Sequence, residues 1–427
     1  MISGLLTVAR WDLQQRVRSR RLLVGWVIWM LALVGLAGFI VWVAQQNGQY
    51  LDHPDQWGVQ YGPTIFGFTV LATLACSLVI VPVFSASAIV AERESATLAT
   101  LQATTLTPGQ IAGGKLVSAS AVAAAFLAGA IPALGIAIGV GHIGIGRAAV
   151  CLLSMYIEMV LLSAIALGWS AIASRSLVSI VLSYLTVFVL TVGTLVAFAF
   201  LMFTTTTQIV TKTWALSTTD QYNYATQLKD YYTAHPTPDD SLAPAPPLDK
   251  CTWQSPDYKT TQTHSERFWW LLLGNPFAIV SDAAPLPPEA KGDVQAYMRV
   301  SGADPLAVIA YAVRTARLGE PSVTNDCFVD STWLSTASTF WHFDISPNPD
   351  GSFTVRGSTD VSPDDLRTTG VVVRPPSPVP PRTINMNTPL WPIGLGANLI
   401  VAAAFFALTV RRISVPYGKL PKGQRVA

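Results

Sequence analysis

Six long apolar stretches dominate the pattern of hydrophobic and polar positions along the chain. A helix needs roughly 20 apolar residues to cross a bilayer core about 30 Å thick. The stretches of sufficient length are Leu22–Ala44, Ile65–Val90, Leu116–Val140, Ala148–Ala173, Leu177–Phe203 and Leu390–Val410. They predict an all-α integral membrane bundle of six transmembrane helices. A further apolar stretch, Phe268–Val280, is shorter and contains Pro276, so we expect an interfacial or re-entrant piece there.

The composition agrees with this pattern. Of the 427 residues 51% are hydrophobic and only 12% are charged, whereas a soluble domain carries roughly 25% charged residues. A soluble globular protein and a disordered chain are therefore both excluded. The net charge of +2 is too small to indicate a nucleic-acid partner.

Basic residues set the expected orientation, because Lys and Arg near the ends of spans favour the cytoplasmic side. The connection 45–64 has neither Lys nor Arg. The basic residues that flank the first and last spans are Arg10, Arg16, Arg18, Arg20, Arg21, Arg411, Arg412, Lys419, Lys422 and Arg425. We expect a multi-pass protein of the cell membrane with both termini in the cytoplasm. The first span is too long for a cleaved signal peptide and is interpreted as an anchor.

The region 204–389, between the fifth and sixth spans, is expected to form an extracytoplasmic domain of mixed α and β structure. Asp304 and Pro305 suit the start of a helix that reaches Leu318, with Gly319 at its end. A β-hairpin is predicted where Phe340–Ser346 and Ser352–Gly357 flank a turn.

Cys251 and Cys327 are the only cysteines of this region. In an oxidising exterior they could form a disulfide, which would close a loop of about 75 residues and add about 4 kcal/mol. Two separate buried thiols are the alternative.

The chain carries no HExxH, no GxSxG and no cysteine pair at metal-binding spacing. Gly109–Lys115 fits the GxxxxGK pattern of a phosphate-binding loop, but Leu116 stands where that loop needs Ser or Thr, and no strand is expected before it. We therefore predict neither a catalytic site nor a metal or cofactor on this chain.

Glu158 is the only acidic residue well inside a predicted span. A charge there costs on the order of 3 kcal/mol, so the side chain should face the bundle interior or be protonated. Two interpretations stay open: a residue of a transport pathway or subunit contact, and a neutral Glu bonded to a nearby hydroxyl.

The connection Ala91–Lys115, AERESATLATLQATTLTPGQIAGGK, lies between the second and third spans. Leu98, Leu101 and Ile111 could form the apolar stripe of a short helix along the membrane surface. An ordinary solvated loop is the alternative.

This connection resembles the corresponding segment of ABC-2 type exporter permeases, whose pattern is roughly E-R-E-x-G-T-L-x-x-L-x-x-T-P-L-S-x-x-x-I-x-x-G-K. The matching residues are Glu92, Arg93, Glu94, Thr97, Leu98, Leu101, Thr104, Leu106, Ile111, Gly114 and Lys115. Ala96, Thr105 and Thr107 depart from it. In that family the segment is a coupling helix that contacts a separate ATPase subunit.

The resemblance covers more than this connection, because the family has six spans with both ends inside, an amphipathic helix before span one and an external element before span six. The outer domain as a whole is not a general feature of the family. We expect five parts in this chain. They are a cytoplasmic amphipathic N-terminal helix (1–21), spans one to five with the coupling segment 91–115 (22–203), the extracytoplasmic domain (204–389), span six (390–410) and a basic cytoplasmic tail (411–427) similar to that of actinobacterial members. Asn275-Pro276-Phe277 resembles the external element that precedes the last span in the family.

The resemblance implies the permease subunit of an ATP-driven exporter of the ABC-2 (type V) kind, without an ATPase site of its own. Its expected partners are membrane lipid, a second permease, identical or paralogous, and an ABC ATPase that binds ATP and Mg. The alternative is a membrane-anchored receptor or envelope assembly protein whose extracytoplasmic domain is the working part.

Overall fold

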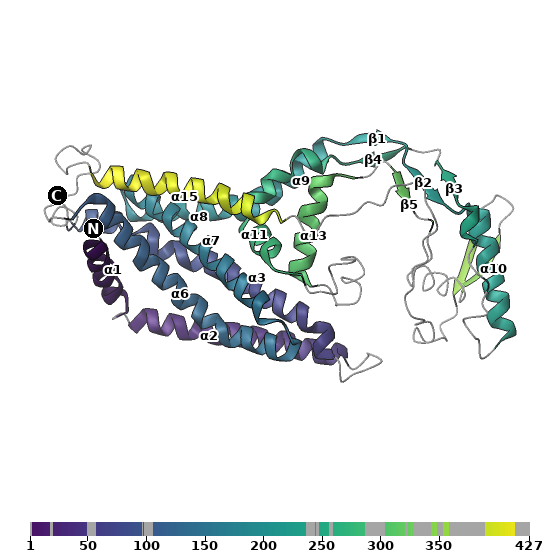
Figure 1. The fold of residues 1–427 in the computed structure, drawn as a ribbon, viewed down its shortest axis with the longest axis horizontal. Coiled ribbons are helices and arrows are strands. Elements are labelled where there is room, and N and C mark those ends of the chain that lie inside the picture. Colours follow the sequence, from purple (N-terminus) through teal and green to yellow (C-terminus); the bar gives the residue numbers. More distant parts are fainter. Residues whose placement is uncertain are drawn as a thin grey trace. The chain divides into compact units, whose positions relative to one another are not determined.

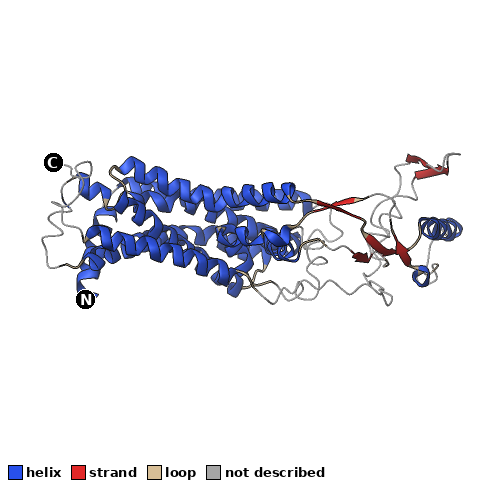
Figure 2. Cartoon of the chain, turned by 90° about the horizontal axis from the view of Figure 1, so that it is seen from above, coloured by secondary structure: helices blue, strands red, loops and turns tan. Residues whose placement is uncertain are grey.

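The structure is a computed structural model. It describes residues 2–17, 20–48, 57–95, 97, 106–235, 244, 247–255, 259–286, 304–320, 323–325, 327, 343–347, 353–357 and 389–414. The described residues are mostly helical (Figures 1 and 2). They divide into two compact units. The bundle unit comprises Met1–Thr204, Ser265–Leu318 and Ile384–Ala427, and the strand unit comprises Thr205–His264 and Gly319–Thr383.

Among the described residues of the bundle unit, six helices are long and apolar enough to cross a membrane, and they indicate a multi-pass membrane protein. The prediction of a six-span helical bundle is confirmed to that extent. The helices are α2 (Arg20–Gly48), α3 (Trp57–Ala86), α6 (Pro108–Gly141), α7 (Ile145–Ile172), α8 (Ser176–Phe188) continued by η2 (Val189–Gly193) and α9 (Thr194–Thr204), and α15 (Trp391–Ile413). The segment η2 is a single π-helical turn within the fifth span.

Helices α6 and α7 form the centre of the bundle, where they pack against each other and against α3 and α15. The core between them is large and apolar, with Phe66, Leu74, Met155 and Met159 fully buried. The short helix α1 (Ile2–Val17) packs on the first turns of α6. The end of α15 lies beside the start of α6, since Ile413 and Ile111 share one buried cluster. The helix α1 and the end of α15 therefore lie at the same end of the bundle (Figure 1).

The short apolar stretch 268–280 does not form a seventh span. It folds into the 3-10 helix η6 (Trp269–Gly274) and the short helix α11 (Pro276–Ala283), preceded by η5 (Ser265–Arg267). Both η6 and α11 pack against α15 and against α13 (Pro305–Leu318).

Helix α13 begins as the sequence predicts. The Asp304 side chain accepts hydrogen bonds from the backbone N–H groups of Leu306 (3.1 Å) and Ala307 (3.4 Å). Gly319 follows the helix with φ 68°, a left-handed conformation that glycine adopts without strain.

The predicted domain 204–389 does not fold as one compact unit. Its middle portion, Ser265–Leu318, belongs to the bundle unit. The physical reason is an apolar cluster in which Leu272 of η6 and Val313 of α13 are buried together with Leu390, the residue before α15. This burial holds η6 and α13 to the last span.

The strand unit contains three small sheets among its described residues. Strand β1 (Thr207–Ile209) pairs antiparallel with β4 (Thr260–Gln262), and β2 (Lys212–Ala215) lies between β3 (Thr252–Gln254) and β5 (Val323–Asn325). The predicted hairpin is confirmed, since β6 (Phe343–Pro347) pairs antiparallel with β7 (Phe353–Gly357). Helix α10 (Thr218–Ala234) and the 3-10 turn η4 (Leu248–Lys250) complete the unit.

Cys251 and Cys327 are joined by a disulfide, with their Cα atoms 6.0 Å apart. The bridge is buried beside Leu216 and Trp214. It connects the residue before β3 to the chain that follows β5. Cys76 and Cys151 are free thiols within α3 and α7.

Candidate functional site

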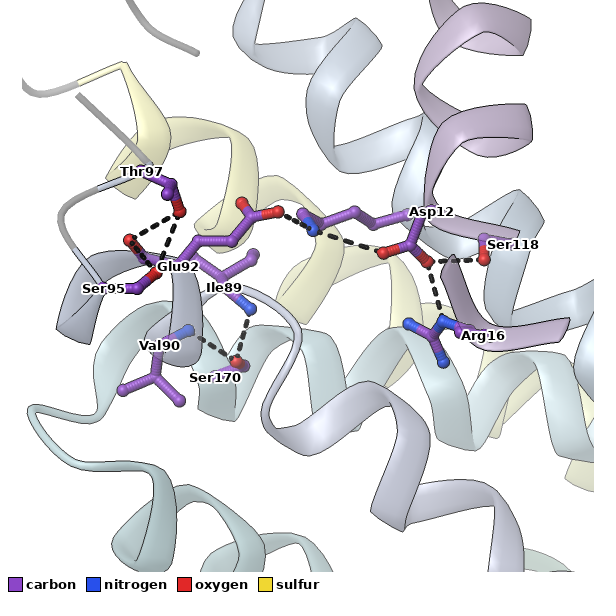
Figure 3. Close-up of polar contacts among 10 residues, drawn as sticks. Asp12, Arg16, Ile89, Val90, Glu92, Ser95, Thr97, Ser118 and Ser170 are labelled. Atoms are coloured by element: carbon purple, nitrogen blue, oxygen red, sulfur yellow. Dashed lines mark hydrogen bonds and ion pairs between the residues drawn. The ribbon is translucent and has the colours of Figure 1, made fainter. Parts of the chain in front are cut away.

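The candidate site lies where α3 ends and the connection to α6 begins. Helix α3 stops at Ala86, and after a short turn the chain re-forms as α4 (Val90–Glu94). The hydroxyl of Ser170 on α7 accepts hydrogen bonds from the backbone N–H groups of Ile89 (2.9 Å) and Val90 (3.1 Å) (Figure 3). The hydroxyl of Ser179 on α8 donates to the carbonyl of Ala86. The backbone groups freed by the break are therefore bonded to two neighbouring helices.

Glu92 of α4 forms an ion pair with Lys115 of α6, with 2.6 Å between Oε1 and Nζ. The Lys115 Nζ also lies 3.7 Å from Oδ1 of Asp12 on α1. Asp12 Oδ2 accepts hydrogen bonds from Arg16 Nε (2.8 Å) and the Ser118 hydroxyl. We call these five residues the connection cluster (Figure 3). It balances two carboxylates with two cations, and its lysine is 2% exposed.

Arg93 is directed to a different helix. Its guanidinium donates to the carbonyls of Ala173 and Ala171 at the end of α7, at 3.1 Å each. These carbonyls have no partner within the helix, and a cation at a helix C-terminus is also favoured by the helix dipole. Arg93 is buried.

Glu94 contacts a third helix. Its carboxylate accepts hydrogen bonds from the backbone N–H of Ser176 (2.9 Å) and from the Ser176 hydroxyl. Ser176 is the first residue of α8, where a negative charge satisfies a free N–H group and complements the dipole. Three consecutive side chains thus fasten α4 to α6, to the end of α7 and to the start of α8.

The GxxxxGK pattern is helical here and has a packing role. Helix α6 begins with a capping box formed by Thr107 and Gln110, and it runs through the whole pattern. A Cβ atom on Gly114 would lie 2.6 Å from Val8 Cβ and 2.9 Å from the Leu5 carbonyl oxygen of α1. Gly114 therefore permits the close approach of α1 that brings Asp12 to Lys115.

The solvent-exposed side of the connection carries small and polar residues. Ala91, Glu94, Ser95 and Thr97 are exposed, and the Thr97 hydroxyl donates to the carbonyl of Glu92 (3.2 Å). Among the other residues of the predicted coupling set, Ile111 is fully buried, and Leu106 packs at the edge of its cluster. Leu98, Leu101 and Thr104 lie outside the described residues, and so does the predicted short amphipathic helix.

The structure places Glu158 apart from the connection cluster. Glu158 is fully buried in α7, and its two carboxylate oxygens accept from the amide nitrogen of Asn398 on α15 at 3.4 and 3.2 Å. The side chain faces the bundle interior, and the partner seen here is an amide. The disulfide Cys251–Cys327 belongs to the strand unit, whereas Glu158 and the connection cluster belong to the bundle unit.

Sequence reasoning missed Asp12, Ser118, Ser170 and Ser176. Asp12 does carry a signal, because it is the single acidic residue among the basic residues before the first span and stands four positions before Arg16. The three serines carry none, since a serine within an apolar helix is common. Among the described residues, no group of three or more His, Cys, Asp or Glu side chains could hold a metal ion.

No family model matches the chain, and no curated protein matches it.

Proposed function

We propose that this chain is the membrane-spanning permease subunit of an ATP-driven ABC-type exporter. In this proposal it forms the translocation pathway with a second permease, and each permease is moved by a separate ATPase subunit that holds ATP and Mg. The proposal starts from the pattern shared by Glu92–Lys115 and ABC-2 permeases.

One observation carries the proposal: the matched residues Glu92, Arg93 and Glu94 each bind a different helix. A rigid joint of this kind passes a displacement of α4 to α1 and α6, to α7 and to α8 together. A subunit that pushes on α4 would therefore move several candidate spans at once, which is the mechanical requirement for coupling nucleotide hydrolysis to a rocking bundle.

The buried members of the joint cannot also be its docking surface. Arg93 and Lys115 are each 2% exposed, so they transmit motion, and contact with an ATPase falls to the exposed residues Ala91, Ser95 and Thr97. The proposal also requires this end of the bundle to be cytoplasmic. The basic residues Arg10, Arg411 and Arg412 near the two termini support that orientation.

The experiment places a bulky charge on the docking surface without removing a described bond. In Ala91→Arg the new side chain projects from the exposed face of α4. We expect membrane insertion to be retained, while the ATPase no longer co-purifies and its hydrolysis is no longer stimulated in proteoliposomes. The matched control is Ala234→Arg, the same change at an exposed position at the end of α10, which should leave both unchanged. Undiminished co-purification of an ATPase with Ala91→Arg would overturn the docking role.

A second candidate is a membrane-anchored receptor or envelope assembly protein. The observation that favours it is the disulfide-linked strand unit, which forms a compact body of its own. This candidate predicts that the intact chain purifies without a nucleotide-hydrolysing partner, and the same experiment separates the two.

A further inference from the structure

Asn275 joins two elements that are far apart in the sequence. It precedes α11, and its side-chain oxygen accepts a hydrogen bond from the Phe277 N–H (2.9 Å), so it caps that helix. Its amide nitrogen donates to the carbonyl of Thr191 (2.8 Å) and to the Thr194 hydroxyl (3.0 Å). Asn275 is 1% exposed, and both ends of its amide are bonded.

The acceptors of this amide lie at the π turn of the fifth span. Thr191 is the central residue of η2 and Thr194 begins α9. A π turn holds one residue more than an α-helical turn, which disturbs the local backbone hydrogen bonds, and such turns recur at functional sites. A backbone carbonyl without a donor is costly in an apolar environment. The Asn275 amide donates to the Thr191 carbonyl of this turn, which also accepts from the Thr194 hydroxyl (3.1 Å).

The residue before Asn275 is tied to the other side of the bundle. The carbonyl of Gly274 accepts from the amide of Asn398 (3.4 Å), the same amide that faces Glu158. Helix α15 approaches η6 closely at this level, since a Cβ atom on Gly394 would lie 2.2 Å from the carbonyl oxygen of Leu273. Gly274 and Asn275 therefore link η2 to α15 and, through Asn398, to α7.

We propose that Asn275 holds the fifth span in its π-bulged register and that its release is a one-residue register switch of α9. Without the amide donor, η2 closes to a regular α-helical turn. Every residue after it then rotates by about 100° around the helix axis, the angle of one residue in an α-helix. Displacement of η6 and α11 releases the amide, so the junction converts a movement of these short helices into a rotation of α9. This inference concerns helix register and does not rest on the proposed transport function.

The switch predicts which residue of α9 faces the short helices. Phe198 packs against the apolar cluster of Leu272, Val313 and Leu390. After closure of the π turn, the preceding residue, Ala197, takes that direction. Disulfide cross-linking in the full chain distinguishes the two registers, with Cys76 and Cys151 changed to Ala. One variant pairs Phe198→Cys with Leu272→Cys, and the other pairs Ala197→Cys with Leu272→Cys.

With Asn275 present, we expect the pair at 198 to cross-link severalfold more than the pair at 197. In Asn275→Ala the preference should reverse. Deleting Val192 from Asn275→Ala should restore the preference for 198, because the deletion removes the extra residue of the turn. Asn275→Asp keeps the cap acceptor of α11 but lacks the amide donor, and it should behave like Asn275→Ala.

Three results would overturn the proposal. The first is an unchanged preference for 198 in both Asn275 variants. The second is a reversed preference that the Val192 deletion does not restore. The third is loss of membrane insertion in both variants without recovery on deletion, since the deletion supplies the register that Asn275 is proposed to hold. Formation of the Cys251–Cys327 disulfide reports independently on the folding of the strand unit.

Discussion

Lys115 Nζ lies 2.6 Å from Glu92 Oε1, although the two residues are 23 positions apart and stand on opposite sides of the connection between the second and third spans. The ion pair closes that connection into a loop whose two ends move together. Because Asp12 of α1 also reaches this lysine, the N-terminal helix is fastened to the same point.

Replacing Lys115 by Met should be strongly destabilising. The change leaves the carboxylates of Glu92 and Asp12 facing each other at a buried position, and breaking a buried ion pair from one side costs about 3–5 kcal/mol. The free energy of unfolding in detergent measures this loss. Arg10→Met, at an exposed position of α1, should change it by less than about 0.5 kcal/mol.

A double-mutant cycle tests whether Glu92 and Lys115 act as a pair. We expect Glu92→Gln combined with Lys115→Met to be less destabilised than the sum of the two single variants, because the second change removes the charge that the first left unpaired. Additive losses would contradict the contact.

Gly114→Ala should separate α1 from α6. The added methyl group would meet Val8 and the backbone of Leu5 at under 3.0 Å, and overpacking of this kind costs about 1–3 kcal/mol. Gly109→Ala is the matched control within the same GxxxxGK pattern, because nothing lies within 4 Å of its Cβ position. Protease accessibility of the N-terminal helix should rise in Gly114→Ala alone, and an equal effect of both substitutions would argue against the close approach.

Asp282→Ala should loosen the start of the last span. One carboxylate oxygen of Asp282 accepts from the backbone N–H groups of Leu390 (2.6 Å) and Trp391 (2.7 Å), and the other accepts from Arg314 Nε (2.6 Å). We expect amide hydrogen exchange at Leu390 and Trp391 to accelerate at least tenfold, since both N–H groups lose their acceptor.

Asp230→Ala, at an exposed position of α10, is the control for that exchange experiment and should leave the two amides protected. If Asp282→Ala left them equally protected, Asp282 would not hold the start of α15.

The strand unit should lose stability at alkaline pH through Tyr224. Burial raises the pKa of this phenol from 10.0 to about 12, and its hydroxyl donates to the Pro244 carbonyl (3.1 Å). The folded state thus holds the proton more tightly than the unfolded state. Its contribution to stability is complete below about pH 10 and is lost as the pH rises towards about 12. Limited proteolysis of the strand unit across this range measures the loss.

Tyr224→Phe should flatten that part of the alkaline profile, because the phenylalanine ring has no proton to lose. The same dependence in both proteins would show that Tyr224 is not the group responsible.

The sequence predicted the elements whose formation depends on residues adjacent in the chain. Apolar length alone identified the six candidate spans, and the pair Asp304 and Pro305 identified the start of α13. The turn residues of 347–351 in the sequence, between two stretches of strand-forming residues, identified the hairpin β6–β7. Each of these depends on neighbours in the sequence, so a single chain suffices to predict them.

The contacts that assemble the site depend on partners distant in sequence. Nothing near Asn275 indicates that its amide reaches Thr191, 84 positions earlier, and the π turn itself has no sequence signature. The resemblance to a coupling segment suggested that Glu92 and Arg93 face a partner subunit. The fold instead turns Arg93 inward, because the carbonyls at the end of α7 need donors.

We propose that a separate nucleotide-hydrolysing subunit binds the solvent-exposed side of α4. A photoactivatable amino acid in place of Ala91, irradiated in intact membranes, tests it most directly, with the adduct identified by mass spectrometry. We expect an adduct with a cytoplasmic protein that contains a phosphate-binding loop. Labelling of position 91 by a membrane-impermeant reagent added outside the cell, or adducts with lipid alone, would contradict it.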